Sequence, residues 1–175
     1  MAKSYKEIMN DITTFIFDVD GVLTDSNVTI TTTGELLRTM NTRDGYAIKT
    51  AIDSGYTVCV ISGGNNEGVR SRLRGLGVTD IYLGIHDKME VFKEFTELYH
   101  IQPETVLYMG DDIPDYYVME KVGLASCPQD AVAEIKQISH YVSHKNGGEG
   151  CVRDVIEQVM KVQGKWMKSA DGKHD

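Results

Sequence analysis

The sequence predicts an α/β fold of the doubly wound, Rossmann-like class, in which helices cover a parallel β-sheet. Short apolar runs alternate along the chain with longer amphipathic stretches. This alternation is typical of parallel βαβ units. Two further short segments interrupt the alternation after the first apolar run and predict a β-hairpin. The expected architecture is therefore a parallel sheet with a flap beside its first strand.

Four apolar runs are expected to be the strands of the sheet. Residues 14–17 are the first run, which ends at an aspartate, and residues 57–61 are the second, which ends at a serine. Residues 81–83 and 105–109 are the third and fourth. The amphipathic stretches between them predict helices over residues 45–54, 66–76, 88–99 and 115–122.

The predicted flap follows the first strand directly. Residues 28–30 and 35–40 flank a turn that contains Gly34, and glycine in such a turn is typical of a β-hairpin. Because the hairpin starts beyond the carboxyl end of the first strand, we expect it to lean over that end.

One domain is expected over residues 1–175, because no linker, repeat or low-complexity segment divides the chain. From residue 163 the sequence becomes polar, which predicts a C-terminal tail over residues 163–175.

Composition narrows the class of protein. The net charge of −8 argues against a nucleic-acid-binding role, although a local site can still bind an anion. No apolar run approaches the roughly 20 residues of a membrane-spanning helix. The three cysteines are widely spaced and odd in number, which argues against a disulfide framework. We therefore expect a cytoplasmic protein without membrane or nucleic-acid partners.

Chemically useful side chains follow the predicted strands. Asp18 and Asp20 come after the first strand, Ser62 and Gly63 after the second, and Asp111 after the fourth. Lys88 opens a predicted helix. Because ligands of an open parallel sheet bind beyond the carboxyl ends of its strands, these residues are expected to share one site.

The residue types at these positions suit magnesium-dependent phosphoryl transfer. Asp18 and Asp111 can supply carboxylate oxygens to Mg²⁺, and Asp20 can add its backbone carbonyl. Asp18 can accept the phosphoryl group, and Asp20 can act as general acid and base. Ser62 and Lys88 would then bind the transferring phosphoryl oxygens.

Each of these residues also has an ordinary structural interpretation. Asp18 and Asp20 can be turn or capping carboxylates, and Asp111 can cap the following helix. Ser62 and Lys88 carry little information alone, because serine often follows a strand and most lysines are solvated. Asp115 is expected to be a cap or a supporting residue.

Four ordered segments resemble the motifs of the haloacid dehalogenase superfamily. They are residues 17–25, residues 62–63, Lys88 and residues 110–115. The resemblance implies a phosphatase that depends on Mg²⁺, with Asp18 as nucleophile and metal ligand. It also implies that Asp20 is the acid/base and a backbone ligand of the metal, and that Asp111 is the third protein ligand.

A narrower resemblance covers the chain from about residue 13 to residue 165. Residues 41–45, residues 147–153 and residues 163–165 resemble the family of 3-deoxy-D-manno-octulosonate 8-phosphate phosphatases. That family implies no large cap domain, a homotetramer in which neighbours help close each site, and hydrolysis of a sugar-acid phosphate on the route to lipopolysaccharide. The substrate contacts implied are Asp20, Asn41, Thr42, Arg43, Asp44, Gly45, Ser62, Gly63, Arg72 and Lys88.

Two positions depart from the commoner pattern of that family. Gly64 and Lys49 stand where many members carry arginine. Phosphatases of related nine-carbon sugar acids are similar too, so a nine-carbon substrate stays an alternative.

A phosphoaspartate receiver module is the alternative from another class of protein. It shares the parallel sheet, the acidic cluster and the lysine. Its acidic pair, however, precedes a phosphoryl-accepting aspartate in the middle of the chain, and it lacks an equivalent of Asp20. The order of the residues here therefore favours the phosphatase.

Overall fold

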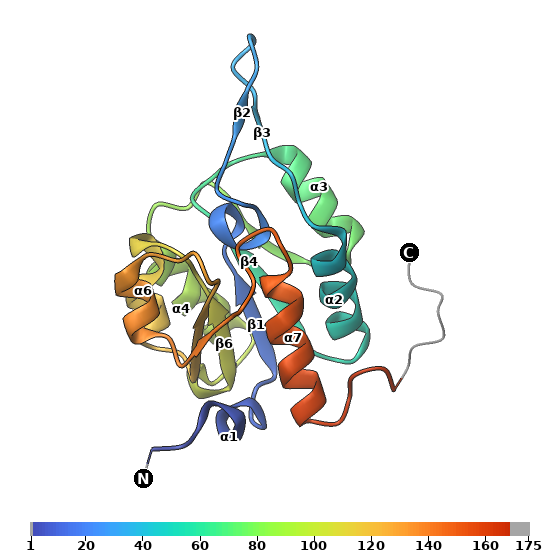
Figure 1. Cartoon of the computed structure of the whole chain (residues 1–175), viewed down its shortest axis with the longest axis vertical. Coiled ribbons are helices and arrows are strands. Elements are labelled where there is room, and N and C mark those ends of the chain that lie inside the picture. The colour runs from blue at the N-terminus through green and yellow to red at the C-terminus, as the bar shows by residue number, and fades with distance from the viewer. Residues whose placement is uncertain (1, 169–175) are drawn as a thin grey trace.

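The computed structural model describes residues 2–168, and within this part of the chain six strands form a parallel sheet in the order β5-β4-β1-β6-β7-β8 (Figure 1). The doubly wound fold class predicted from the sequence is confirmed. The strands are β1 (Thr14–Phe17), β4 (Thr57–Ile61), β5 (Asp80–Tyr82), β6 (Val106–Met109), β7 (Leu124–Cys127) and β8 (Tyr141–Val142). The α-helices are α1 (Tyr5–Met9), α2 (Thr42–Asp53), α3 (Glu67–Gly75), α4 (Lys88–Leu98), α5 (Tyr116–Met119), α6 (Ala133–Ile138) and α7 (Cys151–Val162).

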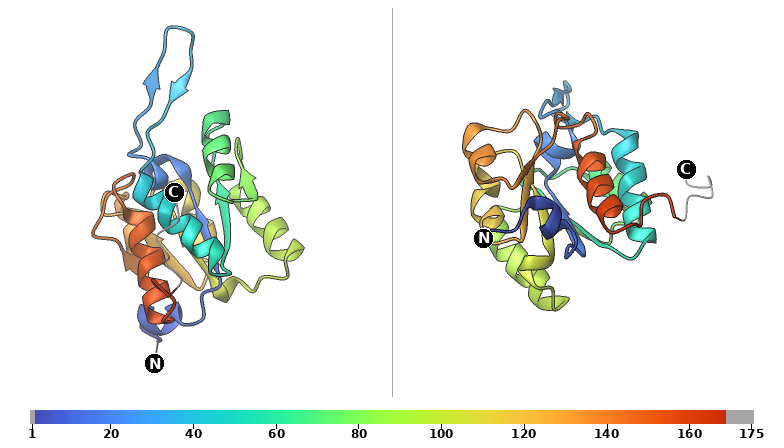
Figure 2. Two further views of the ribbon diagram at one scale, coloured as in Figure 1. Left: turned by 90° about the vertical axis from the view of Figure 1, so that its right-hand side faces the viewer. Right: turned by 60° about the horizontal axis from the view of Figure 1, so that its bottom comes forward.

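The central strand β1 contributes side chains to two apolar cores, one on each face of the sheet. Phe15 and Phe17 enter a core shared with α2 and α7, whereas Ile16 enters the core shared with α4, α5 and α6. Successive side chains of a strand point to opposite faces, so a strand covered on both sides must be apolar throughout. Figures 1 and 2 show α2 and α7 side by side on one face and α4 and α6 on the other.

Most predicted elements agree with the structure, and their differences have local causes. β1 and β4 have the predicted bounds, while β5 begins one residue earlier. Helix α2 begins at Thr42, three residues before the prediction, because the Asn41 side chain caps it by accepting from the backbone N–H groups of Arg43 and Asp44. Strands β7 and β8 were not predicted, since β7 contains the buried Ser126 and β8 is only a two-residue strand.

The predicted hairpin is present as β2 (Thr29–Ile30) and β3 (Leu36–Leu37), and it projects away from the sheet (Figure 1). Gly34 closes its turn with φ of +86°, a backbone conformation that favours glycine. The hairpin carries exposed apolar side chains, including Ile30 at 70% exposure. No large cap domain is found within the described residues.

The first part of the predicted tail lies against its own chain. The Gln163 amide donates to the backbone carbonyls of Met9 and Ile12 at 2.8 and 2.7 Å. The Trp166 ring lies 5.4 Å from the Arg153 guanidinium. Residues 169–175 of that prediction lie outside the described residues.

Two further observations bear on the predictions from composition. None of the helices in the described part of the chain has the length and apolarity to cross a membrane. The three cysteines are buried and unpaired.

Candidate active site

A cleft of about 440 Å³ lies at the carboxyl ends of β1, β4 and β6. It is where an open parallel sheet places its ligands. The lining residues include the six singled out because they follow the predicted strands or open a helix, together with six others: Asp18, Asp20, Ser26, Ser62, Gly63, Gly64, Ile85, His86, Lys88, Asp111, Asp112 and Pro114.

The turn after β1 brings the first acidic motif against the second. Asp18 is buried, and its Oδ1 accepts from the backbone N–H of Val19 at 2.7 Å. Gly21 follows with φ of +87°, and a Cβ on Gly21 would collide with the Asp111 carboxylate. Glycine in this motif therefore permits both the turn and the approach of Asp111.

Lys88 joins two buried carboxylates beneath the cleft. Its Nζ lies 3.0 Å from Asp18 Oδ2 and 2.7 Å from Asp115 Oδ1. Asp115 also accepts from the Tyr108 hydroxyl at 2.6 Å and from the backbone N–H of Asp111 at 3.2 Å. Although burial acts in the opposite direction, the charges of Asp18 and Asp115 raise the pKa of Lys88, so it is a fixed cation.

Three carboxylates converge on one point of the cleft. One oxygen each from Asp18, Asp111 and Asp115 can be chosen such that all three lie within 4.8 Å of one another. Burial and the charge of Asp115 raise the pKa of Asp18 well above its usual range, and the same causes raise the pKa of Asp111 to about 7. A bound cation would relieve this repulsion, and an all-oxygen donor set suits Mg²⁺.

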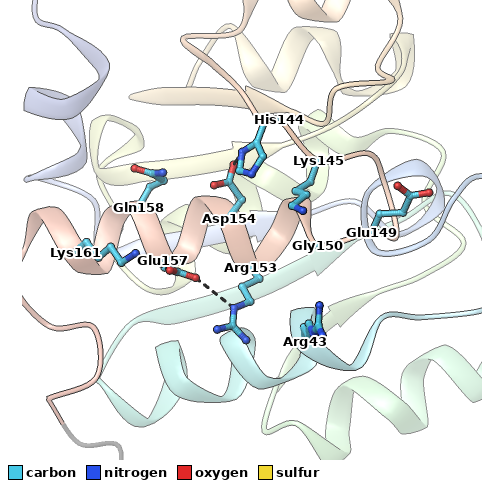
Figure 3. A pocket seen from close by; sticks show the side chains of 10 residues that line it. All are labelled: Arg43, His144, Lys145, Glu149, Gly150, Arg153, Asp154, Glu157, Gln158 and Lys161. Carbon is cyan, nitrogen blue, oxygen red and sulfur yellow. Dashed lines mark hydrogen bonds and ion pairs between the residues drawn. The ribbon is translucent and has the colours of Figure 1, made fainter.

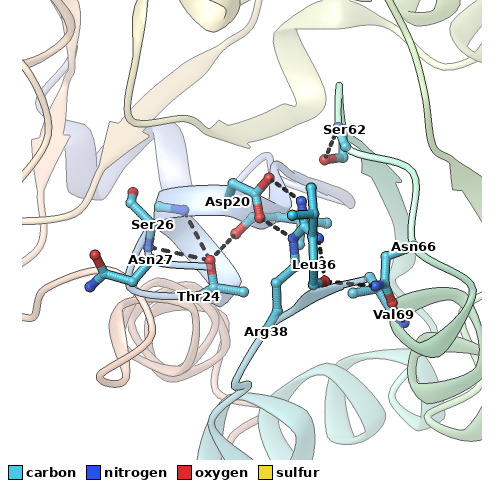
Figure 4. A network of polar contacts seen from close by, with 12 residues as sticks. Asp20, Thr24, Ser26, Asn27, Leu36, Arg38, Ser62, Asn66 and Val69 are labelled. Atoms are coloured by element: carbon cyan, nitrogen blue, oxygen red, sulfur yellow. Dashed lines mark hydrogen bonds and ion pairs between the residues drawn. The ribbon is translucent and has the colours of Figure 1, made fainter. Parts of the chain in front are cut away.

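The remaining cleft residues present polar groups above this cluster. Ser62 is buried, and its Oγ accepts from the backbone N–H of Gly64 at 3.2 Å. The Asp20 carboxylate does not join the acidic cluster but pairs with Arg38 (Figure 4). The predicted metal contact of Asp20 is through its backbone carbonyl and does not require the side chain.

Comparison with known proteins identifies the family. Residues 77–156 match the family model of haloacid dehalogenase-like hydrolases. A 3-deoxy-D-manno-octulosonate 8-phosphate phosphatase of Salmonella typhi is 40% identical over 155 residues, which are 89% of this chain and 82% of that protein. The chain belongs to the 3-deoxy-D-manno-octulosonate 8-phosphate phosphatase family.

Solved structures of this phosphatase family have the same fold. The phosphatase from Yersinia pestis superposes with a TM-score of 0.91 at 36% identity, covering 94% of this chain and 89% of that one. The phosphatase from Moraxella catarrhalis, solved with magnesium, phosphate and the sugar acid, has a TM-score of 0.88 at 28% identity over 91% of each chain. The predicted resemblance is confirmed, and the family is one of hydrolases and not of phosphoaspartate receivers.

The other residues expected from the phosphatase family to contact substrate lie outside the cleft of their own chain. Asn41 caps α2, Thr42 and Arg43 are exposed beside it, and Arg72 packs over Gly45. Asp44 is buried, and its Oδ1 accepts from the backbone N–H of Arg153 at 2.9 Å. None of them appears among the cleft-lining residues given above.

Arg43 instead borders a second cavity of about 470 Å³ at the start of α7 (Figure 3). Both basic and acidic side chains line it, and Arg153 pairs there with Glu157 at 3.3 Å. The other lining residues are His144, Lys145, Glu149, Gly150, Asp154, Gln158 and Lys161.

Sequence reasoning undervalued three residues of the site. Asp115, which was expected to be a cap or a supporting residue, is fully buried at the centre of the Lys88 network. His86, which was not singled out from the sequence, is exposed and lines the cleft. Arg38 was not predicted to belong to the site, because nothing in the sequence of the flap indicates that its side chain reaches Asp20.

Proposed function

We propose that the protein is a magnesium-dependent phosphatase that hydrolyses 3-deoxy-D-manno-octulosonate 8-phosphate, in the synthesis of lipopolysaccharide precursors. The observation that carries this proposal is the buried Asp18 carboxylate on the floor of the cleft, paired with Lys88 and grouped with Asp111 and Asp115. The names of the curated relatives support the sugar-acid substrate.

Asp18 is the nucleophile in this proposal. Its carboxylate oxygen attacks the phosphorus atom, and the bond between phosphorus and the sugar oxygen breaks. Lys88 and Ser62 bind the phosphoryl oxygens, where fixed donors and positive charge count most. The carboxylates of Asp18 and Asp111 and the backbone carbonyl of Asp20 would hold magnesium, which would offset the repulsion between the phosphate and the attacking carboxylate.

Asp20 serves both half-reactions. It gives a proton to the leaving sugar oxygen and then accepts a proton from the water that attacks the aspartyl-phosphate. Its position on the wall of the cleft, two residues beyond Asp18, supports these roles. The roles assigned to individual site residues stay predictions.

A nine-carbon sugar-acid phosphate is the second candidate substrate. Gly64 brings no side chain to the cleft, and the exposed polar side chains that line it include His86 and Asp112. Few charged groups of a single protein chain are therefore available to recognise the sugar acid. This favours neither the eight-carbon nor the nine-carbon substrate.

We extend the proposal to assembly and location. The exposed apolar side chains of the flap, among them Ile30, Leu36 and Leu37, support burial between copies in a homotetramer. Thr42 and Arg43 would then contact substrate in the cleft of a neighbouring copy. The buried, unpaired cysteines support a cytoplasmic location. A single domain over residues 1–175 stays a prediction.

Phosphate release from a panel of substrates tests the function. With magnesium, kcat/KM for 3-deoxy-D-manno-octulosonate 8-phosphate should exceed that for common hexose phosphates by at least about tenfold. Asp18→Asn should abolish release without unfolding the protein. A preference for hexose phosphates would refute the substrate, and a tenfold preference for the nine-carbon acid would favour the second candidate.

A further inference from the structure

Arg38 directly follows strand β3 of the flap and holds Asp20 by both carboxylate oxygens (Figure 4). Arg38 Nε lies 2.6 Å from Asp20 Oδ1, and Nη2 lies 3.0 Å from Oδ2. Paired hydrogen bonds between guanidinium and carboxylate are strong and fix the relative orientation of the two groups. Asp20 therefore has one defined orientation at the edge of the cleft.

The guanidinium of Arg38 is itself fixed to the body of the protein. The Arg38 side chain is only 8% exposed, and its Nη1 donates to the Leu36 carbonyl at 3.0 Å. Asn66 donates to the same carbonyl at 3.0 Å and also caps α3. Because of these contacts, Arg38 joins the flap, α3 and Asp20 in one connected network.

Gly64 leaves room for this ion pair. A Cβ on Gly64 would lie 2.9 Å from Arg38 Nη2 and 3.0 Å from Asp20 Oδ2. A methyl group here would have to displace one or both partners. The absence of a side chain at position 64 is thus matched to the pair, and not only to the shape of the cleft.

The arrangement suits Asp20 to accept a proton. A carboxylate offers about four lone-pair sites, of which Arg38 uses two. The Asp20 side chain is 37% exposed and lines the cleft, so the other sites are accessible to water.

We propose that Arg38 is a positioning residue that holds Asp20 as the proton acceptor in the breakdown of the aspartyl-phosphate. The inference rests on the phosphatase function proposed above. In this half-reaction a water oxygen attacks phosphorus, and the bond between phosphorus and the Asp18 oxygen breaks. The water proton passes to Asp20, and the electron pair of the broken bond restores the Asp18 carboxylate.

The first half-reaction does not require Arg38 when the leaving group is a weak base. Acetyl phosphate is such a donor, because acetate leaves without a proton. Rapid-quench measurement with labelled acetyl phosphate and magnesium therefore separates formation of the phosphoenzyme from its decay. It also involves no sugar acid, so the result does not depend on the substrate assignment.

Arg38→Gln should slow decay of the phosphoenzyme by about tenfold to a hundredfold, since a misplaced base loses much of its contribution. Formation should stay within about threefold of the unmodified protein, so kcat and KM should fall together. Arg74→Gln, an exposed arginine of α3, is the matched control and should change neither rate.

Two further variants test the geometry while keeping a positive charge at position 38. Arg38→Lys keeps the charge but not the paired hydrogen bonds, and should recover only part of the decay rate. Gly64→Ala should slow decay by displacing the pair, whereas Gly75→Ala, whose Cβ would meet open space, should not. Full recovery by lysine would overturn the positioning role.

A double-mutant comparison decides whether Arg38 acts through Asp20. Asp20→Asn should slow decay strongly, and adding Arg38→Gln should slow it by no more than about twofold further. Independent, multiplying losses would overturn the inference. An equal loss in formation and decay for Arg38→Gln would overturn it too, because that result indicates a general disturbance of the site.

Discussion

Lys88 Nζ lies 3.0 Å from Asp18 Oδ2, so the proposed nucleophile and the lysine form a buried ion pair before any substrate binds. Asp115 holds the other side of Lys88 at 2.7 Å and lies among carboxylates of the same sign. One lysine therefore offsets much of the repulsion in a cluster that also suits a divalent cation. Lys88 is thus expected to affect both catalysis and stability.

Replacement of this lysine tests both effects. Lys88→Met should lower the rate of phosphoryl transfer by about a hundredfold or more. It should also destabilise the metal-free protein by about 3–5 kcal/mol, because a buried ion pair loses one partner. Thermal unfolding with and without magnesium measures this, and magnesium should raise the melting temperature of the variant more than that of the unmodified protein.

The exposed Lys93 on the same helix provides the control. Lys93→Met should leave activity and melting temperature unchanged. If Lys88→Met melted at the same temperature as the Lys93 variant, the ion pairs of Lys88 would be shown to contribute no stability.

Asp44 predicts a pH dependence of stability. Burial raises the pKa of Asp44 to about 6, and its Oδ2 has no hydrogen-bond partner among the described residues. Because the pKa is higher in the folded state than in the unfolded state, the folded state holds the proton more tightly. The contribution of this group to stability therefore falls as the pH rises from about 4 to above 6, and a shift of this size corresponds to about 3 kcal/mol.

Asp44→Asn removes this ionisation and keeps an oxygen to accept from the backbone N–H of Arg153. Denaturant unfolding at pH 4 to 8 should show the unmodified protein losing stability relative to the variant as the pH rises. If the free energies of unfolding of the two proteins changed with pH in the same way, ionisation of Asp44 would not be the cause of the loss of stability.

The flap predicts the oligomeric state. Light scattering of the unmodified protein should give about four times the chain mass of 19.5 kDa. Ile30→Lys places a charge on a side chain that is 70% exposed in one copy and should reduce the measured mass. Leu98→Lys, at 66% exposure on α4, is the matched control. An active monomer in the unmodified protein would contradict the proposed tetramer.

Replacement of Gln163, at the start of the tail, is expected to lower the stability of the protein without affecting catalysis. Gln163→Leu leaves the carbonyls of Met9 and Ile12 without their donor and should destabilise the protein by about 1–3 kcal/mol. Denaturant unfolding measures this loss, and Gln158→Leu on α7 serves as the control. A change in kcat without a change in stability would instead assign Gln163 to the catalytic cycle.

The sequence by itself determined the class of fold and the acidic motifs of the site. A strand segment buried on both faces must be apolar, as residues 15–17 and 58–61 are, and residues that follow such strands meet at one edge of the sheet. The turn glycine of the flap is likewise a local signal. These features were predictable because burial pattern and chain order alone specify them.

Only the tertiary structure decided which side chains meet. Lys88 and Asp115 are separated by 27 residues, and Arg38 and Asp20 by 18. Neither pair has a spacing that indicates contact, because each depends on how separate elements pack across the sheet. Packing also turned Asp44 away from the cleft, toward the start of α7. The type and charge of a side chain can be read from the sequence. Which side chain it contacts depends on how the chain folds between the two residues.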